Sequence, residues 1–368
     1  MQQEKFMMRM AIYCFVFVAT AMGAMLYYSA NKIIVVADVA QDEVIRSEEH
    51  NEVQGVQEVQ EIQEVKPVVT EKNQILIDRD SQNTNYFCIP LPESVRAEEV
   101  TVENHYMDRE LWISIEPKEM AGLDKFYEGN SVYGNSESVL DGHFEVEGQR
   151  VCLRFKLTDV YEYHSIFEDN TLYVDFMAPK EAYDKIIVID PAYGLDDSGV
   201  SIETVNAKVI TLEIARALKT KLDETDIKVY YTRMDDSNPN AESRVGLASA
   251  TKADMLIRIE VAGAESSKEY GTEAVYNSRF FIPGFGSIEL ADLLEREVVT
   301  AISGKANGLL EAAEDDIVIC DATVPAAAIK VGYLTNGQEA ILLQREDYIQ
   351  RIAEGIYQAI VKAYDEQL

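Results

Sequence analysis

The chain has 368 residues, 47% of them apolar, and carries a formal net charge of −32. This length and apolar content are sufficient for more than one hydrophobic core, so we expect two domains. The acidic balance disfavours nucleic acid and anionic lipid surfaces as partners, because both are bound by clustered Lys and Arg. An acidic surface of this kind commonly serves solubility alone.

The first strong signal is an uncharged apolar run over residues 10–30. Its length matches that of a helix crossing a bilayer, and Lys5 and Arg9 precede it, which favours a cytoplasmic N-terminus. We therefore predict a cytoplasmic tail over residues 1–9, a transmembrane anchor over 10–30, and a single-pass plasma-membrane protein whose C-terminal domains are extracytoplasmic. A cleaved signal peptide is the alternative, but the apolar run is longer than a usual signal core.

Residues 31–72 form an acidic, low-complexity segment without aromatic residues. An apolar residue recurs at every third position through its second half, at Val53, Val56, Val59, Ile62 and Val65. A period of three fits neither a coiled coil nor a strand. We predict a stalk that carries the domains away from the membrane; the alternative is a partner-binding strip or short helix.

Apolar and polar residues alternate between residues 73 and 182, as in "LWISI" from Leu111 and "VCLRFKL" from Val151. This period of two is typical of strands with one buried face, so we predict a small all-β domain over residues 73–182. Cys88 and Cys152 fall inside it. They form either a disulfide or two buried free thiols, because four scattered cysteines define no framework.

Strand-like and helical patterns alternate over residues 184–368. The strand-like runs are "KIIVID", "IKVYYT", "MLIRIE", "TEAVYN", "DIVIC" and "AAAIKVG". Near the C-terminus Ile349, Ile352, Ile356 and Ile360 form one stripe of a helix. This alternation predicts an α/β domain with a mainly parallel sheet and helices on both faces.

The last domain contains no histidine. The four histidines of the chain all precede it: His50, His105, His143 and His164. The domain therefore cannot build a His-based zinc site, a Ser-His-Asp triad or a Cys-His pair from its own residues.

Several separated blocks nevertheless resemble one family in the same order along the chain: "KIIVIDPAYG", "KVYYTRMDD", "SRVGLASATKADMLIRIE", "GTEAVYN" and "PAAAIKVGYLTNGQEAILLQ". They are similar to the zinc-dependent N-acetylmuramoyl-L-alanine amidases, which hydrolyse the bond between the glycan and the stem peptide of peptidoglycan. The resemblance implies an amidase-like fold from Asp184 to about Tyr364.

The resemblance also implies a zinc site of two histidines and a glutamate, with a second glutamate as catalytic base. Here Tyr193, Ala207 and Glu260 occupy the three ligand positions, and Lys330 occupies the catalytic one. Glu203 is the only acid near Ala207 that could replace the missing ligand. We therefore expect no metal ligand, no catalytic residue of the family type and no cofactor.

Elementary chemistry supports that expectation. Tyrosine is a poor metal ligand near neutral pH, alanine has no donor, and a lysine repels a dication where a base is needed. The remaining pocket candidates are Asp190, Tyr193, Glu203, Glu260 and Lys330. Because buried charges need partners, we predict that Glu260 and Lys330 approach within about 4 Å, with the Tyr193 hydroxyl donating to the carboxylate.

Two functions of different class follow. In the first, the domain is a pseudoenzyme that binds peptidoglycan or a cell-wall enzyme. In the alternative, it is an active N-acetylmuramoyl-L-alanine amidase with an atypical metal site, in which acids recruit a hard cation. The acids available for such a site are Asp190, Asp196, Asp197, Glu203 and Glu260. A third reading is a folded spacer.

Overall fold

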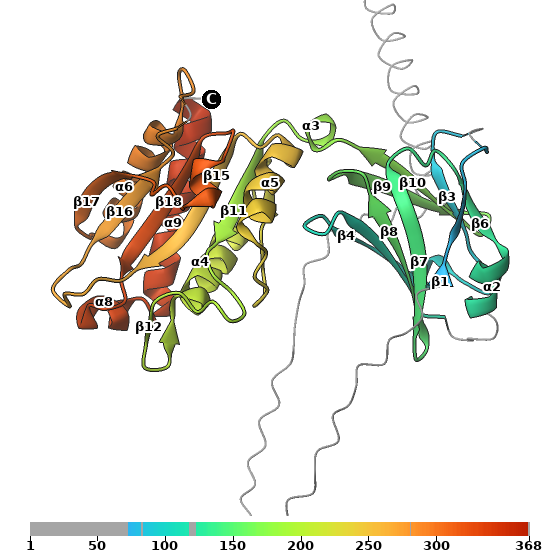
Figure 1. Ribbon diagram of the computed structural model, residues 1–368, viewed down its shortest axis with the longest axis horizontal. Helices are drawn as coiled ribbons and strands as arrows, with labels where there is room; N and C mark the ends of the chain where they lie inside the picture. The colour runs from blue at the N-terminus through green and yellow to red at the C-terminus, as the bar shows by residue number, and fades with distance from the viewer. Residues whose placement is uncertain (1–72, 82–83, 118–122, 280, 367–368) are drawn as a thin grey trace, which may run out of the picture. The chain divides into compact units, whose positions relative to one another are not determined.

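The computed structural model describes residues 73–81, 84–117, 123–279 and 281–366 (Figure 1). The predicted cytoplasmic tail, anchor and stalk lie outside these residues. The chain divides into two compact units, of which the first runs to Thr158 and includes Tyr163–Phe176, and the second contains Asp159–Glu162 and continues from Met177. No helix within the described ranges is long and apolar enough to cross a membrane.

The first unit contains two five-stranded sheets, ordered β1-β7-β8-β5-β4 and β2-β6-β3-β10-β9. Their strands are β1 Asn73–Gln74, β2 Leu76–Asp78, β3 Phe87–Pro90, β4 Val100–His105, β5 Glu110–Ile115, β6 Ser131–Gly134, β7 Val139–Glu147, β8 Arg150–Leu157, β9 Glu162–Glu168 and β10 Thr171–Met177. Two short helical segments complete the unit, η1 Ala97–Glu99 and α2 Leu123–Gly129.

The core of this β-domain lies between the two sheets. Phe87 of β3 and Phe155 of β8 meet there edge to face, with ring centroids 5.1 Å apart. The alternating residues of β5 and β8 that predicted strands are buried, including Leu111, Ile113 and Leu153. Cys88 in β3 and Cys152 in β8 are buried free thiols, which is one of the two states expected for them.

The second unit is built on a six-stranded sheet ordered β14-β11-β15-β18-β16-β17. Its strands are β11 Ile186–Pro191, β14 Lys228–Tyr231, β15 Met255–Ala262, β16 Thr272–Tyr276, β17 Ala306–Glu311 and β18 Ala326–Tyr333. β14, β11, β15 and β18 run parallel, whereas β16 pairs antiparallel with β18 and parallel with β17. The carboxyl ends of the four parallel strands and the start of β16 therefore lie at the same end of the sheet.

Helices cover both faces of this sheet. The helices α4 Ala207–Leu222, α6 Ser287–Ile302 and α9 Glu346–Glu366 pack on one face around a single core that includes Ile187, Ile257 and Ile329. The helices α5 Ala241–Thr251 and α7 Ile317–Cys320 contact strands of the same sheet from the other side. Three peripheral pieces remain: α3 Pro179–Ala182, α8 Gly337–Leu342, and the hairpin of β12 Ser201–Ile202 with β13 Val205–Asn206.

One strand prediction in this unit is wrong. The segment "DIVIC" forms the helical turn α7, because the Asp316 carboxylate accepts the backbone N–H of Ile319 at 3.3 Å and caps the turn. β17 was not predicted. Its pattern is interrupted by Gly308, whose φ of 97° lies at an irregularity in the pairing with β16.

Candidate functional site

The candidate residues gather where the parallel strands end, on the sheet face that carries α5 and α7. Asp190 of β11 is in register with Arg258 of β15, and Glu260 of β15 is in register with Lys330 of β18. On the other side of Lys330, Glu273 of β16 is its register partner. Residues in register point to the same face of a sheet, and Arg258 and Glu260 are two positions apart on β15, so all five side chains share one face. We call these five residues the charged row.

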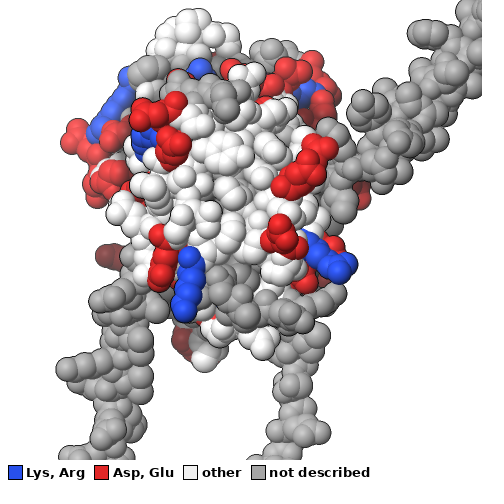
Figure 2. Space-filling model, turned by 90° about the vertical axis from the view of Figure 1, so that its right-hand side faces the viewer, with Lys and Arg blue, Asp and Glu red and all other residues white. Residues whose placement is uncertain are grey.

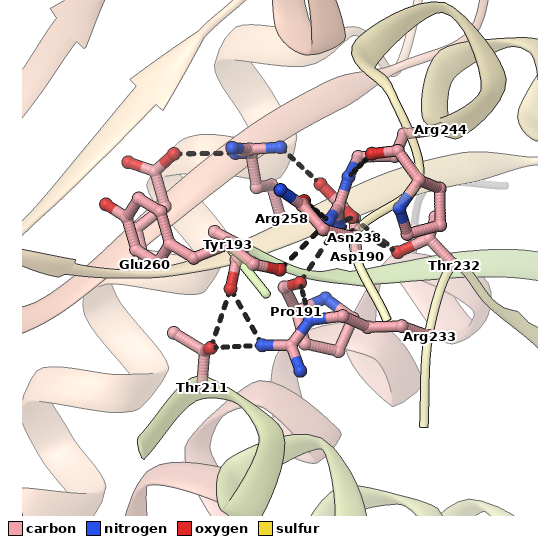
Figure 3. Close-up of polar contacts among 12 residues, drawn as sticks. Asp190, Pro191, Tyr193, Thr211, Thr232, Arg233, Asn238, Arg244, Arg258 and Glu260 are labelled. Atoms are coloured by element: carbon pink, nitrogen blue, oxygen red, sulfur yellow. Dashed lines mark hydrogen bonds and ion pairs between the residues drawn. The ribbon is translucent and has the colours of Figure 1, made fainter. Parts of the chain in front are cut away.

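Asp190 is the buried anchor of this row. Its carboxylate has no exposed surface and accepts hydrogen bonds from Arg258 Nη1 and Thr232 Oγ1, both at 2.5 Å, and from Arg244 (Figure 3). Burial alone would raise the pKa of Asp190, but Arg258, Arg244 and Thr232 together hold that pKa below its usual range. Asp190 is therefore an ionised structural acid whose oxygens are already occupied.

Two buried arginines fix the loop that follows β11. Arg233 donates to the carbonyls of Pro191 and Ala192, at 2.9 and 2.8 Å. Arg244 donates to the carbonyls of Pro191 and Tyr193, at 3.0 and 2.9 Å (Figure 3). Burial, with the neighbouring Arg244 as a further cause, lowers the pKa of Arg233 to about 10. The backbone around Tyr193 is thus held by side chains that belong to the domain itself.

Tyr193, which the sequence predicts at the position of the first family ligand, has a backbone conformation that non-glycine residues seldom adopt. Its φ is 69°, and its ring lies against Gly199, where an added Cβ would come within 2.7 Å of the ring. Burial raises the pKa of the Tyr193 phenol well above its usual value, and Glu260 raises it further. The phenol therefore stays protonated at physiological pH.

The predicted ion pair between Glu260 and Lys330 is wrong. Glu260 Oε1 instead accepts from Arg258 Nε at 2.6 Å, and Lys330 Nζ donates to Glu273 Oε1 at 2.9 Å. Glu260 and Lys330 are in register on neighbouring strands, but each pairs with a different residue of opposite charge. Arg258 is two residues along the same strand as Glu260, and Glu273 faces Lys330 from the antiparallel strand.

The ion pair between Lys330 and Glu273 is joined by a third residue, Tyr333. Tyr333 donates its hydroxyl to Glu273 Oε2 at 3.0 Å, so that both oxygens of this carboxylate are bound. Burial raises the pKa of Tyr333 to about 12, and the nearby Glu273 contributes. The Lys330 side chain keeps 28% of its surface exposed and is accessible to a ligand, whereas Glu273 is nearly covered, at 12%.

Asp316, which the sequence did not indicate, lies within electrostatic range of the same row. Burial raises the pKa of its carboxyl group, Glu260 raises it further, and Arg258 opposes the shift. The site thus holds one acid that is firmly ionised, Asp190, and one that resists ionisation, Asp316.

Ala207 and Glu203 do not supply a ligand to this row. Ala207 is fully buried at the first position of α4, where its methyl group belongs to the core. Glu203 is exposed in the turn between β12 and β13, with a φ of 54°. Among the contacts of the described residues, none joins Glu203 to Asp190, Tyr193 or Lys330. Glu203 as a pocket candidate therefore stays a prediction that rests on the sequence alone.

The residues that organise the site were missed at the sequence level. Arg258, Arg244, Arg233 and Glu273 are all largely buried and all hold a candidate residue or its backbone. One signal was present: Arg258 is a charged residue inside the apolar strand "MLIRIE", and a charge in such a place requires a partner. Arg244 and Glu273 gave no comparable signal.

The α/β domain is similar to known proteins. The N-acetylmuramoyl-L-alanine amidase family matches residues 187–362. The "Uncharacterized protein YqiI" of Bacillus subtilis is 30% identical over 182 residues, which cover 50% of this chain and 86% of that protein. The "Germination-specific N-acetylmuramoyl-L-alanine amidase" of the same organism is 27% identical over 199 residues, covering 50% and 81%. The catalytic domain of CwlV from Bacillus (Paenibacillus) polymyxa var. colistinus is a similar solved structure, with 29% identity and a TM-score of 0.46, covering 49% of this chain and 98% of that one.

Proposed function

Because the chain belongs to the N-acetylmuramoyl-L-alanine amidase family, we propose that its α/β domain binds peptidoglycan without hydrolysing it. The protein is held outside the plasma membrane by its N-terminal apolar segment. Family membership supports the peptidoglycan part of this proposal, and the local chemistry at the strand ends supports the lack of hydrolysis.

The side chains at the family's zinc positions do not fit a zinc ion. Tyr193 is a phenol kept protonated by burial, and Ala207 offers no donor atom. Glu260 is the one potential ligand of the three, and it already accepts from Arg258 at 2.6 Å. A dication placed there would lie beside a guanidinium whose own pKa is raised by Asp190 and Glu260 despite the opposing effect of burial.

The observation that carries the proposal is the pairing of Lys330 with Glu273. A catalytic base must be free to take a proton from water. Lys330 at that position is instead cationic and bound at 2.9 Å to a carboxylate of the same domain. What remains at the strand ends is a polar surface of Lys330, Tyr193 and Glu260, which can hydrogen-bond an amide or a carboxylate. The Glu260 carboxylate is already bound to Arg258 at 2.6 Å, which opposes its use as a base.

A zinc and hydrolysis assay with a restored variant tests the lack of catalysis. The full chain is expected to contain no stoichiometric zinc and to release no peptide from purified peptidoglycan. A variant with Tyr193→His, Ala207→Glu, Glu260→His and Lys330→Glu restores the family residues and is expected to gain about one zinc per chain, as measured by metal analysis. Peptide release by the unaltered chain that follows it through purification would support the active amidase with an atypical metal site.

Binding is tested separately by sedimentation with purified sacculi. The unaltered chain is expected to co-sediment, and Lys330→Met to reduce the bound fraction, because a cation accessible at the strand ends is lost. Lys219→Met on α4 is the matched control, since that lysine only pairs with Asp223 of its own helix. Equal binding by all three proteins would place the peptidoglycan contact elsewhere.

Membrane anchoring is tested by fractionation of cells before and after external protease treatment. We expect the full chain in the membrane fraction and cleavage within the predicted stalk by protease added outside, because low-complexity segments are cut readily. Recovery in the cytoplasmic fraction, or protection from external protease, would contradict this part of the proposal.

A further inference from the structure

The loop between β16 and α6 exposes a short apolar segment. Among the large apolar side chains in the described part of the chain, Phe281 has the highest exposed fraction, 86%. Ile282 beside it is half-buried, and Pro283 is exposed. We call Phe281, Ile282 and Pro283 the apolar tip. An aromatic side chain that is so open to water gains free energy when a partner covers it.

Hydrogen bonds fix the two ends of this loop. Asn277 Nδ2 donates to the carbonyls of Cys320 and Ala322, at 3.3 and 3.1 Å. At the other end, Ser287 Oγ accepts the backbone N–H of Ala326, the first residue of β18, at 3.0 Å. A loop that is already held at its ends loses less conformational entropy when it binds, so the apolar tip is prepared for a partner.

A pocket of about 320 Å³ lies in the same domain, between the β12–β13 hairpin, α4 and the start of α9. We call it the α4 pocket. Its apolar lining residues are Val205, Val209, Ile210, Leu343 and Ile349, and Glu213 is among the polar ones. Val209 is 50% exposed, so the lining is accessible from solvent. A pocket of this volume is near the lower limit for binding a ligand and suits one or two large apolar side chains.

The apolar tip and the α4 pocket lie at opposite ends of the sheet, so a chain cannot fill its own pocket. Tyr276, the last residue of β16, is in register with Ala327 near the start of β18, so the loop with the apolar tip leaves from the amino end of the parallel strands. α4 begins at the other end, beside the loop after β11, where the N–H of Ala207 donates to the carbonyl of Val200 at 2.9 Å. Figure 1 shows β12 and α8 at this second end of the domain.

We infer that the apolar tip of one chain inserts into the α4 pocket of a second copy of the chain. The chain itself supplies both halves of this apolar contact, and the charges beside them are complementary. Arg279 pairs with Asp321 next to the tip, and Arg216 pairs with Glu213 at the pocket, so each side offers one cation and one anion to the other. Because the tip and the pocket are different surfaces, each chain can take part in two such contacts. The inference concerns surfaces away from the charged row and does not rest on the proposed function.

The contact should be weak and should depend on salt. One buried aromatic side chain contributes about 150–250 Å², well below the roughly 800 Å² that each partner buries in a stable interface. Acidic side chains are spread over the face of the molecule shown in Figure 2, and the net charge of −32 makes two copies repel each other. Association should therefore strengthen as sodium chloride screens this repulsion.

Disulfide cross-linking of the full chain, solubilised in detergent, tests the inference. Phe281→Cys and Val209→Cys are each made in a Cys14→Ser background, and one of them carries an affinity tag so that a mixed dimer has its own mass. The other three cysteines are buried free thiols: Cys88, Cys152 and Cys320. Under mild oxidation the mixed sample should form the tagged–untagged dimer, with a yield that rises with salt. Leu310→Cys mixed with Val209→Cys is the matched control, since Leu310 is also exposed, at 46%, but lies on β17.

The role of the aromatic ring is tested with the cysteine moved to Pro283, the exposed end of the apolar tip. Pro283→Cys should also link to Val209→Cys. Adding Phe281→Ser should lower that yield about tenfold or more, because no ring fills the pocket, whereas Phe281→Leu should keep most of it. Three results would overturn the inference: a mixed dimer no more abundant than in the Leu310→Cys control, an unchanged yield with Phe281→Ser, or Phe281→Cys linking to itself as readily as to Val209→Cys. The last result would assign the apolar tip to a contact between two tips.

Discussion

Arg258 is the residue on which the charged row depends, because it holds two carboxylates at once. Its guanidinium binds Asp190 through Nη1 and Glu260 through Nε, and its side chain keeps only 14% of its surface exposed. A buried ion pair adds little net stability when it is complete, but breaking one leaves an uncompensated charge. Loss of the Arg258 guanidinium should therefore cost more stability than loss of the Lys330 ammonium.

Arg258→Met should therefore destabilise the domain strongly. We expect a loss of about 3–5 kcal/mol in the free energy of unfolding, the usual cost of stranding a buried charge. Lys330→Met is the control, and because Lys330 is twice as exposed it should cost no more than about 1–2 kcal/mol. Urea unfolding followed by circular dichroism gives both numbers. Equal, small effects would mean that Arg258 is not the organising cation.

A double-mutant cycle tests the pairing itself. Glu260→Gln and Arg258→Met should be non-additive by at least about 1 kcal/mol, because the two residues share a bond of 2.6 Å. Glu260→Gln and Lys330→Met should add, since neither is the other's partner. Strong coupling in the second cycle would show that Glu260 and Lys330 exchange partners in solution.

Asp316 provides a prediction that depends on pH. Burial and then Glu260 raise the pKa of Asp316 in the folded protein, so the folded state holds this proton more tightly than the unfolded chain does. Ionisation therefore costs stability as the pH rises through the folded pKa, and the cost disappears below the unfolded value of about 3.9. Asp316→Asn keeps an oxygen that can accept from Ile319. It should raise Tm at pH 7, and the gain should shrink as the pH falls toward that value. A gain independent of pH would refute the electrostatic cause.

At the scale of elements, the helices α6 and α9 are in close contact where they cross at Gly355. A Cβ added at Gly355 of α9 would lie 2.5 Å from the Cα of Val298 on α6. The stripe of Ile352, Ile356 and Ile360 packs in the same core with no exposed surface. Gly355 therefore sets the distance between α6 and α9, two of the three helices that cover this face of the sheet.

Gly355→Ala should be destabilising although alanine is the better helix former. Alanine in place of a mid-helix glycine normally adds about 0.5–1 kcal/mol, but here the methyl group would displace backbone, and we expect a net loss of about 1–3 kcal/mol. Gly246→Ala in α5 is the matched control, since its added Cβ would meet nothing within 4 Å. That variant should gain stability. Thermal unfolding of both proteins compares them directly, and a gain in Gly355→Ala would contradict the packing argument.

The sequence predicted the elements of the α/β domain better than it predicted the contacts at its site. Strong periodicity identified the strands β11, β14, β15, β16 and β18 and the buried stripe of α9, because burial on one face leaves a direct trace in the pattern. α7 was mistaken for a strand, since four apolar residues fit either state and the capping role of Asp316 decided between them. The pairing of Lys330 with Glu273 could not be predicted from the sequence, because it depends on β16 running antiparallel to β18.

At the scale of the whole molecule, the excess of acids should make stability depend on salt. The chain has 65 Asp and Glu residues against 33 Lys and Arg residues, so self-repulsion opposes the compact state. Salt screens this repulsion at the surface and reaches the buried Asp190 bonds much less. Sodium chloride should therefore raise Tm, with potassium chloride giving the same curve. A falling Tm would mean that surface ion pairs outweigh the net repulsion.

The reversed direction of β16 has a consequence for how the fold can vary. Residues 263–271 connect the carboxyl end of β15 to the start of β16, and both lie at the same end of the sheet. The carboxyl end of β18 lies between them. A loop that starts and finishes at the same end of a sheet can be lengthened without changing the path of any strand. Descendants of this fold could thus acquire or lose a covering segment beside Lys330 and Glu273 while the core and the strand register stay the same.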